Sequence, residues 1–107
     1  MTEPDKVAQL RELIEMDPDD AVLHYGLGCE HLRRGEFEAA IEPLLRALEL
    51  QPDYSAAHRE LGKSLEKLNR REEAVAAYRR GYEVAKGRGD LQTAREIEVF
   101  LKRLETS

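Results

Sequence analysis

The sequence contains one pattern twice, and this repeat constrains the fold more than any other feature of the chain. When residues 21–54 are aligned with residues 55–88 at an offset of 34, seven positions carry the same residue type. A fixed period of this length is typical of stacked helical repeats, in which each unit buries its apolar face against a neighbour. The coinciding pairs are His24/His58, Leu27/Leu61, Gly28/Gly62, Glu38/Glu72, Ala40/Ala74, Arg46/Arg80 and Glu49/Glu83.

Glycine, asparagine and proline divide the chain into short helices. Gly35 and Asn69 occupy equivalent places and both tolerate the left-handed conformation that ends a helix, while Gly87 and Gly89 are expected to break the chain once more. Pro43 lies near the start of a helix, where we expect a mild bend and no helix end. These signals predict helices at about 20–33, 37–50, 55–68, 71–86 and 91–104.

The first 18 residues match the second half of a repeat. At the same offset Leu10 aligns with Leu44 and Ile14 with Leu48, which predicts a helix at 5–16 that lacks its partner. The chain is then a single all-α domain of six helices without strands. Its parts are a half repeat at 5–18, repeats at 21–54 and 55–88, and a capping helix at 90–105.

Small residues recur where the two helices of each repeat would meet. Gly28 and Gly62 stand inside helices, where glycine would otherwise cost up to about 1 kcal/mol relative to alanine. We therefore expect each glycine to face the backbone of a neighbouring helix, with Leu44 and Tyr78 filling the remaining space. The pattern predicts antiparallel helical hairpins that stack side by side.

This combination of small and large residues resembles the tetratricopeptide repeat (TPR) family. The resemblance covers residues 5–88. The family's Trp-x-x-Leu-Gly segment appears as His24-x-x-Leu27-Gly28 and His58-x-x-Leu61-Gly62, its alanines as Ala40, Ala47 and Ala74, and its closing proline as Pro18 and Pro52.

The resemblance implies a right-handed superhelix of antiparallel hairpins that acts as a protein–protein interaction module. Residues 89–107 depart from the pattern, because Arg95 and Glu96 would occupy the Leu-Gly places of a third repeat. That segment resembles the solvating helix that ends arrays of this family. Two and a half repeats make a short array, so the alternative interpretation is a self-associating structural homodimer without a separate peptide ligand.

The resemblance also implies a concave face, lined by the first helix of each hairpin, that holds an extended peptide or a partner helix. Arg59, Lys63 and Lys67 lie four residues apart and form a basic row that suits an acidic peptide or a terminal carboxylate. The alternative is a solvated helix face paired with nearby glutamates. We predict that the groove comprises Val22, Tyr25, Cys29, Arg33, Arg59, Lys63 and Lys67.

Composition argues against several other classes of protein, namely nucleic-acid-binding, membrane-spanning and secreted proteins. The net charge of −5 lacks the basic excess of nucleic-acid-binding proteins, and no run approaches the roughly 18 apolar residues of a membrane-spanning helix. The first residues have no secretory pattern, and the single Cys29 suits a reducing cytoplasm. His24 and His31 fit the packing stripe better than a metal site. We expect a cytoplasmic protein with no enzyme activity, cofactor or metal, and a protein or peptide as its partner.

Overall fold

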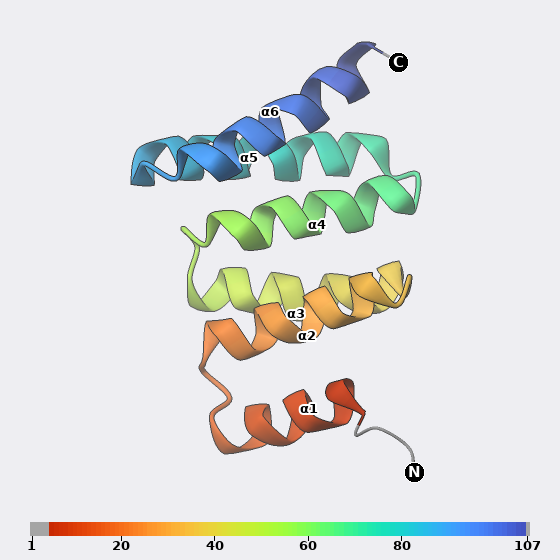
Figure 1. Cartoon of the computed structure of the whole chain (residues 1–107), viewed down its shortest axis with the longest axis vertical. Coiled ribbons are helices and arrows are strands. Elements are labelled where there is room, and N and C mark those ends of the chain that lie inside the picture. The colour runs from red at the N-terminus through yellow and green to blue at the C-terminus, as the bar shows by residue number, and fades with distance from the viewer. Residues whose placement is uncertain (1–4, 107) are drawn as a thin grey trace.

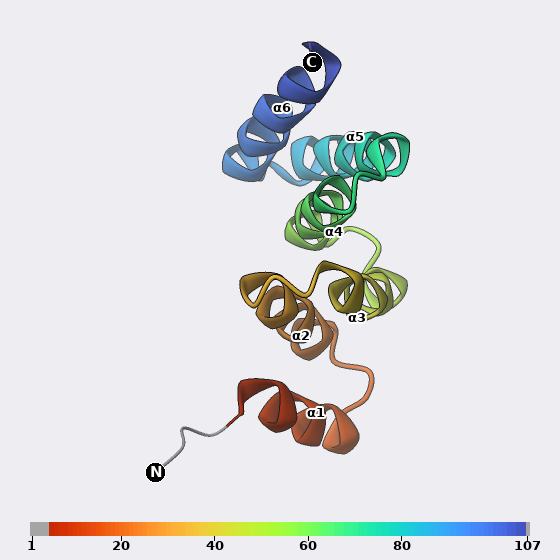
Figure 2. The same cartoon turned by 90° about the vertical axis from the view of Figure 1, so that its right-hand side faces the viewer.

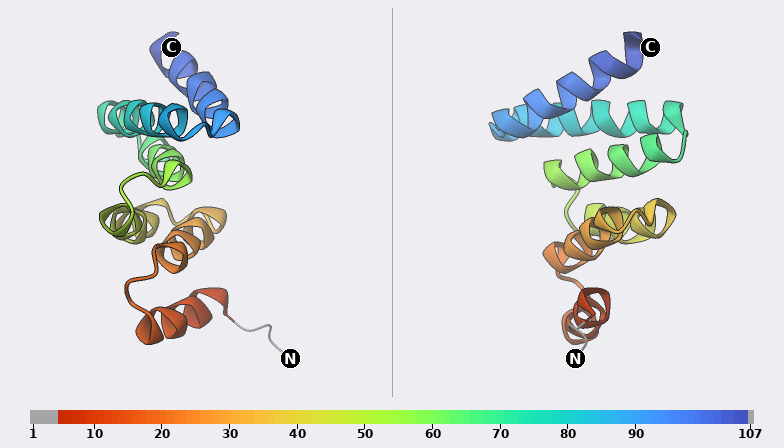
Figure 3. Two further views of the ribbon diagram at one scale, coloured as in Figure 1. Left: turned by 90° about the vertical axis from the view of Figure 1, so that its left-hand side faces the viewer. Right: turned by 45° about the vertical axis from the view of Figure 1, so that its right-hand side comes forward.

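The computed structural model describes residues 5–106, which form six α-helices and no strand. The helices stack along the longest dimension of a molecule that measures 46 × 27 × 20 Å, with the first and last helices at opposite ends (Figures 1 and 3). The prediction of an all-α helical repeat is confirmed. The helices are α1 (Lys6–Met16), α2 (Ala21–Arg33), α3 (Phe37–Leu50), α4 (Ser55–Lys67), α5 (Arg71–Arg88) and α6 (Leu91–Thr106).

Three residues in the left-handed backbone conformation follow the ends of helices. Gly35, Asn69 and Gly89 have φ angles of 76°, 60° and 75°, where glycine and asparagine meet the least steric cost. Gly87 does not break the chain, contrary to the prediction: it lies in the last turn of α5, which continues to Gly89. The helix also continues through Pro43, and α3 ends only at Leu50.

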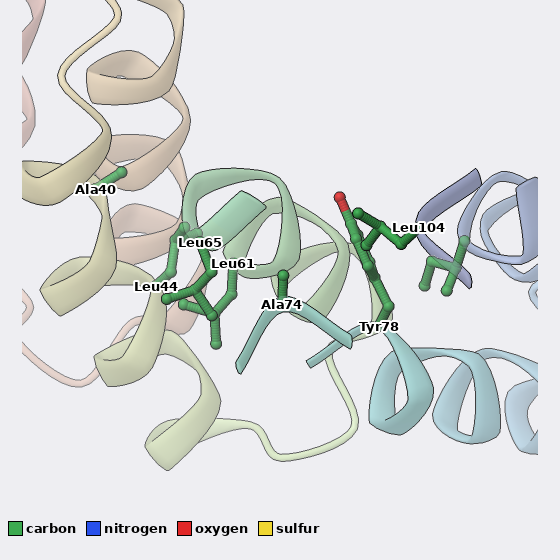
Figure 4. Packing of buried hydrophobic residues seen from close by; sticks show 8 residues of the cluster. Ala40, Leu44, Leu61, Leu65, Ala74, Tyr78 and Leu104 are labelled. Atoms are coloured by element: carbon green, nitrogen blue, oxygen red, sulfur yellow. The ribbon is translucent and has the colours of Figure 1, made fainter. Parts of the chain in front are cut away.

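Each hairpin is closed by a glycine that faces a large side chain of its partner helix. A Cβ added to Gly28 would lie 2.6 Å from Leu44 Cγ, and one added to Gly62 would lie 2.5 Å from Tyr78 Cδ1. The expectation that these glycines face backbone is therefore corrected, since the nearest atoms belong to side chains. Leu44 and Tyr78 are fully buried within one apolar cluster, part of which is drawn in Figure 4.

Helix α6 takes the place of the first helix in a third repeat, but its register is shifted. Helix α4 begins at residue 55 and α6 at residue 91, an interval of 36 instead of 34. Leu61 and Ile97, each six residues after its helix start, are both buried. The equivalents of the Leu-Gly pair are thus Ile97 and Glu98, and not Arg95 and Glu96 as predicted. The exposed Glu98 replaces the small residue that a further hairpin partner would need.

The two kinds of helix lie on different sides of the stack. In Figure 2, α2 and α6 lie toward the left of the molecule and α3 and α5 toward the right. Helix α4 contacts α2, α3, α5 and α6, whereas α1 contacts α2 alone among the described helices. The first helices of the hairpins and α6 therefore share one face, which is the face that the sequence predicts as the groove.

Candidate partner-binding groove

An open hollow of about 850 Å³ lies along the face shared by α2, α4 and α6. Its walls combine apolar side chains with four cations and two glutamates, Glu60 and Glu66, and every helix of that face contributes at least one cation. The lining includes Cys29, Leu32, Arg33, Phe37, Lys63, Lys67, Phe100 and Arg103.

The structure brings four of the seven predicted groove residues to this hollow, namely Cys29, Arg33, Lys63 and Lys67. The other three lie outside it. Val22 is 60% exposed in the first turn of α2, and the ring of Tyr25 stacks on Tyr54 with 4.8 Å between centroids.

Arg59, the third residue outside the hollow, is engaged in ion pairs. Its guanidinium donates to Glu60 Oε1 at 2.9 Å and to Glu96 Oε1 at 2.8 Å, and its side chain is only 17% exposed. Arg59 therefore links α4 to α6 instead of presenting a free charge. Of the three residues in the predicted basic row, Lys63 and Lys67 line the hollow and Arg59 does not.

Arg33, Lys67 and Arg103 form a ladder of cations, one from each helix of the face. Arg33 and Lys67 are 34 residues apart and Lys67 and Arg103 are 36 apart, so all three occupy the same place in their helices. Arg103 was missed by the sequence analysis, and the shifted register of α6 is the signal that would have found it. Cations are also favourable at these positions because the last turns of helices carry partial negative charge.

Lys67 differs from the other cations of the hollow. Arg33 and Arg103 each bind a glutamate at 2.5 Å, and Lys63 lies 3.4 Å from Glu60. Lys67 is exposed and has no carboxylate within 4.0 Å among residues 5–106. An acidic ligand could therefore pair with Lys67 without first breaking an internal ion pair.

Phe100 supplies the apolar floor between two cations. Lys63 Nζ lies 5.5 Å and Arg103 Cζ 5.3 Å from the centroid of its ring, within the range of cation–π attraction. The ring of Tyr78 packs at 5.4 Å behind it, which fixes the orientation of Phe100. The hollow thus offers apolar contact and positive charge within the same small area.

Cys29 lies in the hollow but lacks the features of a reactive thiol. Burial raises the pKa of the Cys29 thiol, and a hydrogen bond from Tyr25 offsets only part of this effect. Arg33, the cation one helical turn after Cys29, is held by Glu30, whose pKa it lowers to about 2. The thiol therefore stays protonated at neutral pH and acts as a small packing residue.

Two histidines make the same hydrogen bond in successive repeats. His24 Nε2 donates to the carbonyl of Pro18 at 2.8 Å, and His58 Nε2 donates to the carbonyl of Pro52 at 3.0 Å. Each bond ties a helix to the loop that precedes it. In residues 5–106, no three His, Cys, Asp or Glu side chains converge as metal ligands would.

His58 makes stability depend on pH. Burial is the main cause that lowers the pKa of His58, and Arg80 adds to it. Because the unfolded chain then binds this proton more tightly, we expect the free energy of unfolding to fall as pH drops below about 6.5. Chemical denaturation between pH 7.5 and 5.5 measures this, and His58→Gln serves as the comparison. Equal slopes for both proteins would contradict the assignment.

The tetratricopeptide repeat family model matches residues 25–91, which is more than half of the chain. The chain belongs to the TPR family. A TPR repeat-containing protein of Pseudomonas aeruginosa is 35% identical over 96 residues, which cover 90% of this chain and 91% of its relative.

Solved structures agree with this TPR assignment. A Bordetella parapertussis protein of known solution structure is 33% identical, with a TM-score of 0.85 over 97% of this chain and 90% of that one. The TPR2B domain of yeast Sti1, solved as a complex with pHsp70, gives a TM-score of 0.88 over 94% of this chain and 80% of its own. At 18% identity, this second likeness shows the fold alone. No described helix of this TPR protein is long and apolar enough to cross a bilayer.

Proposed function

We propose that this TPR protein is an adaptor whose groove binds an extended protein segment with an acidic end. TPR proteins are scaffolds for protein interaction, and the Sti1 domain of the same fold was solved with a bound partner. The observation that carries the proposal is Lys67, an exposed cation without an internal carboxylate partner among residues 5–106, at the centre of the cation ladder. The cytoplasmic location stays a prediction.

The composition of the hollow defines the segment that would fit. A carboxylate at Lys67 would gain a charge-assisted hydrogen bond, and the four cations of the hollow outnumber its two glutamates. An apolar side chain next to that carboxylate would pack on Phe100, Leu32 or Phe37. The preferred ligand is therefore a peptide with an apolar residue followed by acidic residues.

Charge reversal at Lys67 tests this directly. We expect Lys67→Glu to weaken binding of acidic peptides at least about tenfold, which corresponds to about 1.4 kcal/mol, because one charge-assisted bond becomes a repulsion. Lys67→Met is expected to have an intermediate effect. The measurement is fluorescence anisotropy with labelled peptides that end in an apolar residue and two aspartates, each compared with its asparagine counterpart.

Lys86→Glu is the matched control, because Lys86 is an exposed cation of α5 outside the hollow. Arg59 is left unchanged, since its reversal would break the link between α4 and α6. Equal affinity for aspartate and asparagine peptides, or equal losses in the Lys67 and Lys86 variants, would contradict the proposed groove. Circular dichroism of each variant confirms that the helices remain.

A further inference from the structure

The opposite side of the stack carries two hollows at equivalent places in successive repeats. One lies between α1 and α3 with α2 as its floor, and the other, of about 690 Å³, lies between α3 and α5 with α4 as its floor. The floors correspond residue by residue, since His24 and Leu27 become His58 and Leu61 at the offset of 34. The repeat therefore builds the same hollow twice from the same backbone.

The two hollows differ in chemistry. Where the first has His31 and Glu42, the second has Leu65 and Ala76. Both repeats form the same helical hairpin, so the fold does not require apolar residues at these two positions. The second hollow, which we call the apolar hollow, has Ile41, Leu45, Leu48, Leu61, Leu65 and Ala77 among its apolar lining, and two acids and two arginines, Glu49, Glu73, Arg70 and Arg80, also line it.

Helix α1 leaves an apolar edge uncovered at the end of the stack. Leu13 is 45% exposed and Met16 is 74% exposed, and they lie three residues apart on one edge of the helix. At the offset of 34, Leu13 corresponds to Ala47, which is fully buried by the first helix of its own hairpin. No such helix covers α1 within residues 5–106, because α1 contacts α2 alone.

Charge favours a contact between these two surfaces of different copies. Residues 5–54 carry 12 acidic and 5 basic side chains, a net charge of −7, whereas residues 55–106 carry 9 acidic and 12 basic, a net charge of +3. The acidic N-terminal half of one copy is therefore attracted to the basic C-terminal half of another copy. Acidic residues surround the apolar edge of α1, namely Glu12, Glu15, Asp17 and Asp19.

Arg80 marks where an acid from a second copy would bind. Its counterpart in the first repeat, Arg46, lies 3.3 Å from Asp19 in the loop that follows α1. The residue equivalent to Asp19 is Asp53, which binds Arg88 at 2.5 Å instead. Arg80 lines the apolar hollow, is exposed, and has no carboxylate within 4.0 Å in the described part of the chain.

We propose that the apolar hollow binds the C-terminal half of α1 from a second copy of this chain. Leu13 and Met16 of that copy cover the hollow, and an acid near Met16 pairs with Arg80. This gives the homodimer alternative a specific surface, separate from the groove on the other face. If each of two copies places its α1 in the hollow of the other, a closed two-fold dimer forms. If each copy binds the α1 of a different copy, the contact repeats and a longer assembly forms. Association is weak, because the apolar edge is small.

Sedimentation velocity at micromolar to millimolar concentrations tests the proposal with two complementary variants. Ala76→Glu places the residue of the first hollow into the apolar hollow, and Met16→Lys removes the apolar tip of α1; both positions are exposed. The wild-type chain is expected to associate as concentration rises. Each variant alone should sediment as a single chain at all concentrations. An equimolar mixture should associate again, because one variant keeps an intact α1 and the other keeps an intact hollow.

The mixture separates loss of the contact from loss of the fold, since misfolded variants would not restore association. Val99→Lys on α6, where Val99 is 61% exposed, is the control and should associate like the wild type. A wild-type chain that stays single at millimolar concentration would overturn the proposal. A mixture that stays dissociated while the wild type associates would also overturn it. Peptide binding in the groove should persist in Ala76→Glu, so the two proposals fail independently.

Discussion

Replacing Tyr78 with alanine is expected to lower the free energy of unfolding by about 3–5 kcal/mol, because a large ring is removed from the core. Tyr78 is the largest of the fully buried side chains, and it packs in the apolar cluster that α3, α4, α5 and α6 share. Its loss leaves a cavity beside Gly62, which has no side chain to fill the space. Because small domains are stable by about 5–15 kcal/mol in total, urea denaturation will show a much lower midpoint.

Tyr78→Phe separates the ring from the hydroxyl. The phenol donates a hydrogen bond to Glu66 Oε1 at 2.9 Å, and removing it should cost about 1 kcal/mol. The phenylalanine ring still fills the space opposite Gly62. Comparable losses in the alanine and phenylalanine variants would show that the hydroxyl, and not ring packing, dominates the stabilisation.

Alanine at Gly62 is expected to destabilise the protein by about 1–3 kcal/mol, although alanine favours helices more than glycine does. The new methyl group would overlap the Tyr78 ring, a rigid plane held by the surrounding core. Gly28→Ala should also be destabilising, because the added methyl group would lie 2.6 Å from Cγ of the fully buried Leu44. Thermal and urea denaturation of both variants measures these losses.

Gly87→Ala is the matched control for the helical glycines. Gly87 lies in the last turn of α5 and is exposed, and an added Cβ would meet no side chain or neighbouring helix within 4 Å beyond its adjacent residues. Here the substitution should stabilise the protein by about 0.4–1 kcal/mol by restricting the unfolded chain. If Gly62→Ala were also stabilising, the contact with Tyr78 would not explain why glycine stands there.

The helices could be predicted closely because their signals are local. Each predicted helix agrees with the structure to within about two residues at either end, which is the usual uncertainty of helix boundaries. The exception at Gly87 has a clear cause. One glycine is tolerated in a last helical turn, and only Gly89 takes the left-handed conformation that ends α5.

The groove was harder to predict because its charges depend on residues distant in sequence. The spacing of Arg59, Lys63 and Lys67 correctly placed three cations along one helix. Glu60 of the same helix pairs with Arg59 and Lys63, and Glu96 of α6 holds Arg59 from 37 residues away. Arg103 also lines the groove from α6. Its position follows from the interval of 36 residues between the starts of α4 and α6, which is two more than the repeat period.

The amino-acid sequence by itself determined the repeat, the helices and the pairing of small with large residues, since these follow from spacing within about one hairpin. The tertiary structure alone decided which charges are free and which apolar surfaces are uncovered. Lys67 and Arg80 resemble their neighbours in sequence, yet they lack carboxylate partners among residues 5–106. Pairs within one helix, such as Lys63 with Glu60, follow from local spacing. Pairs such as Arg59–Glu96 and Arg103–Glu66 join helices that meet only after stacking, and no local pattern records those contacts.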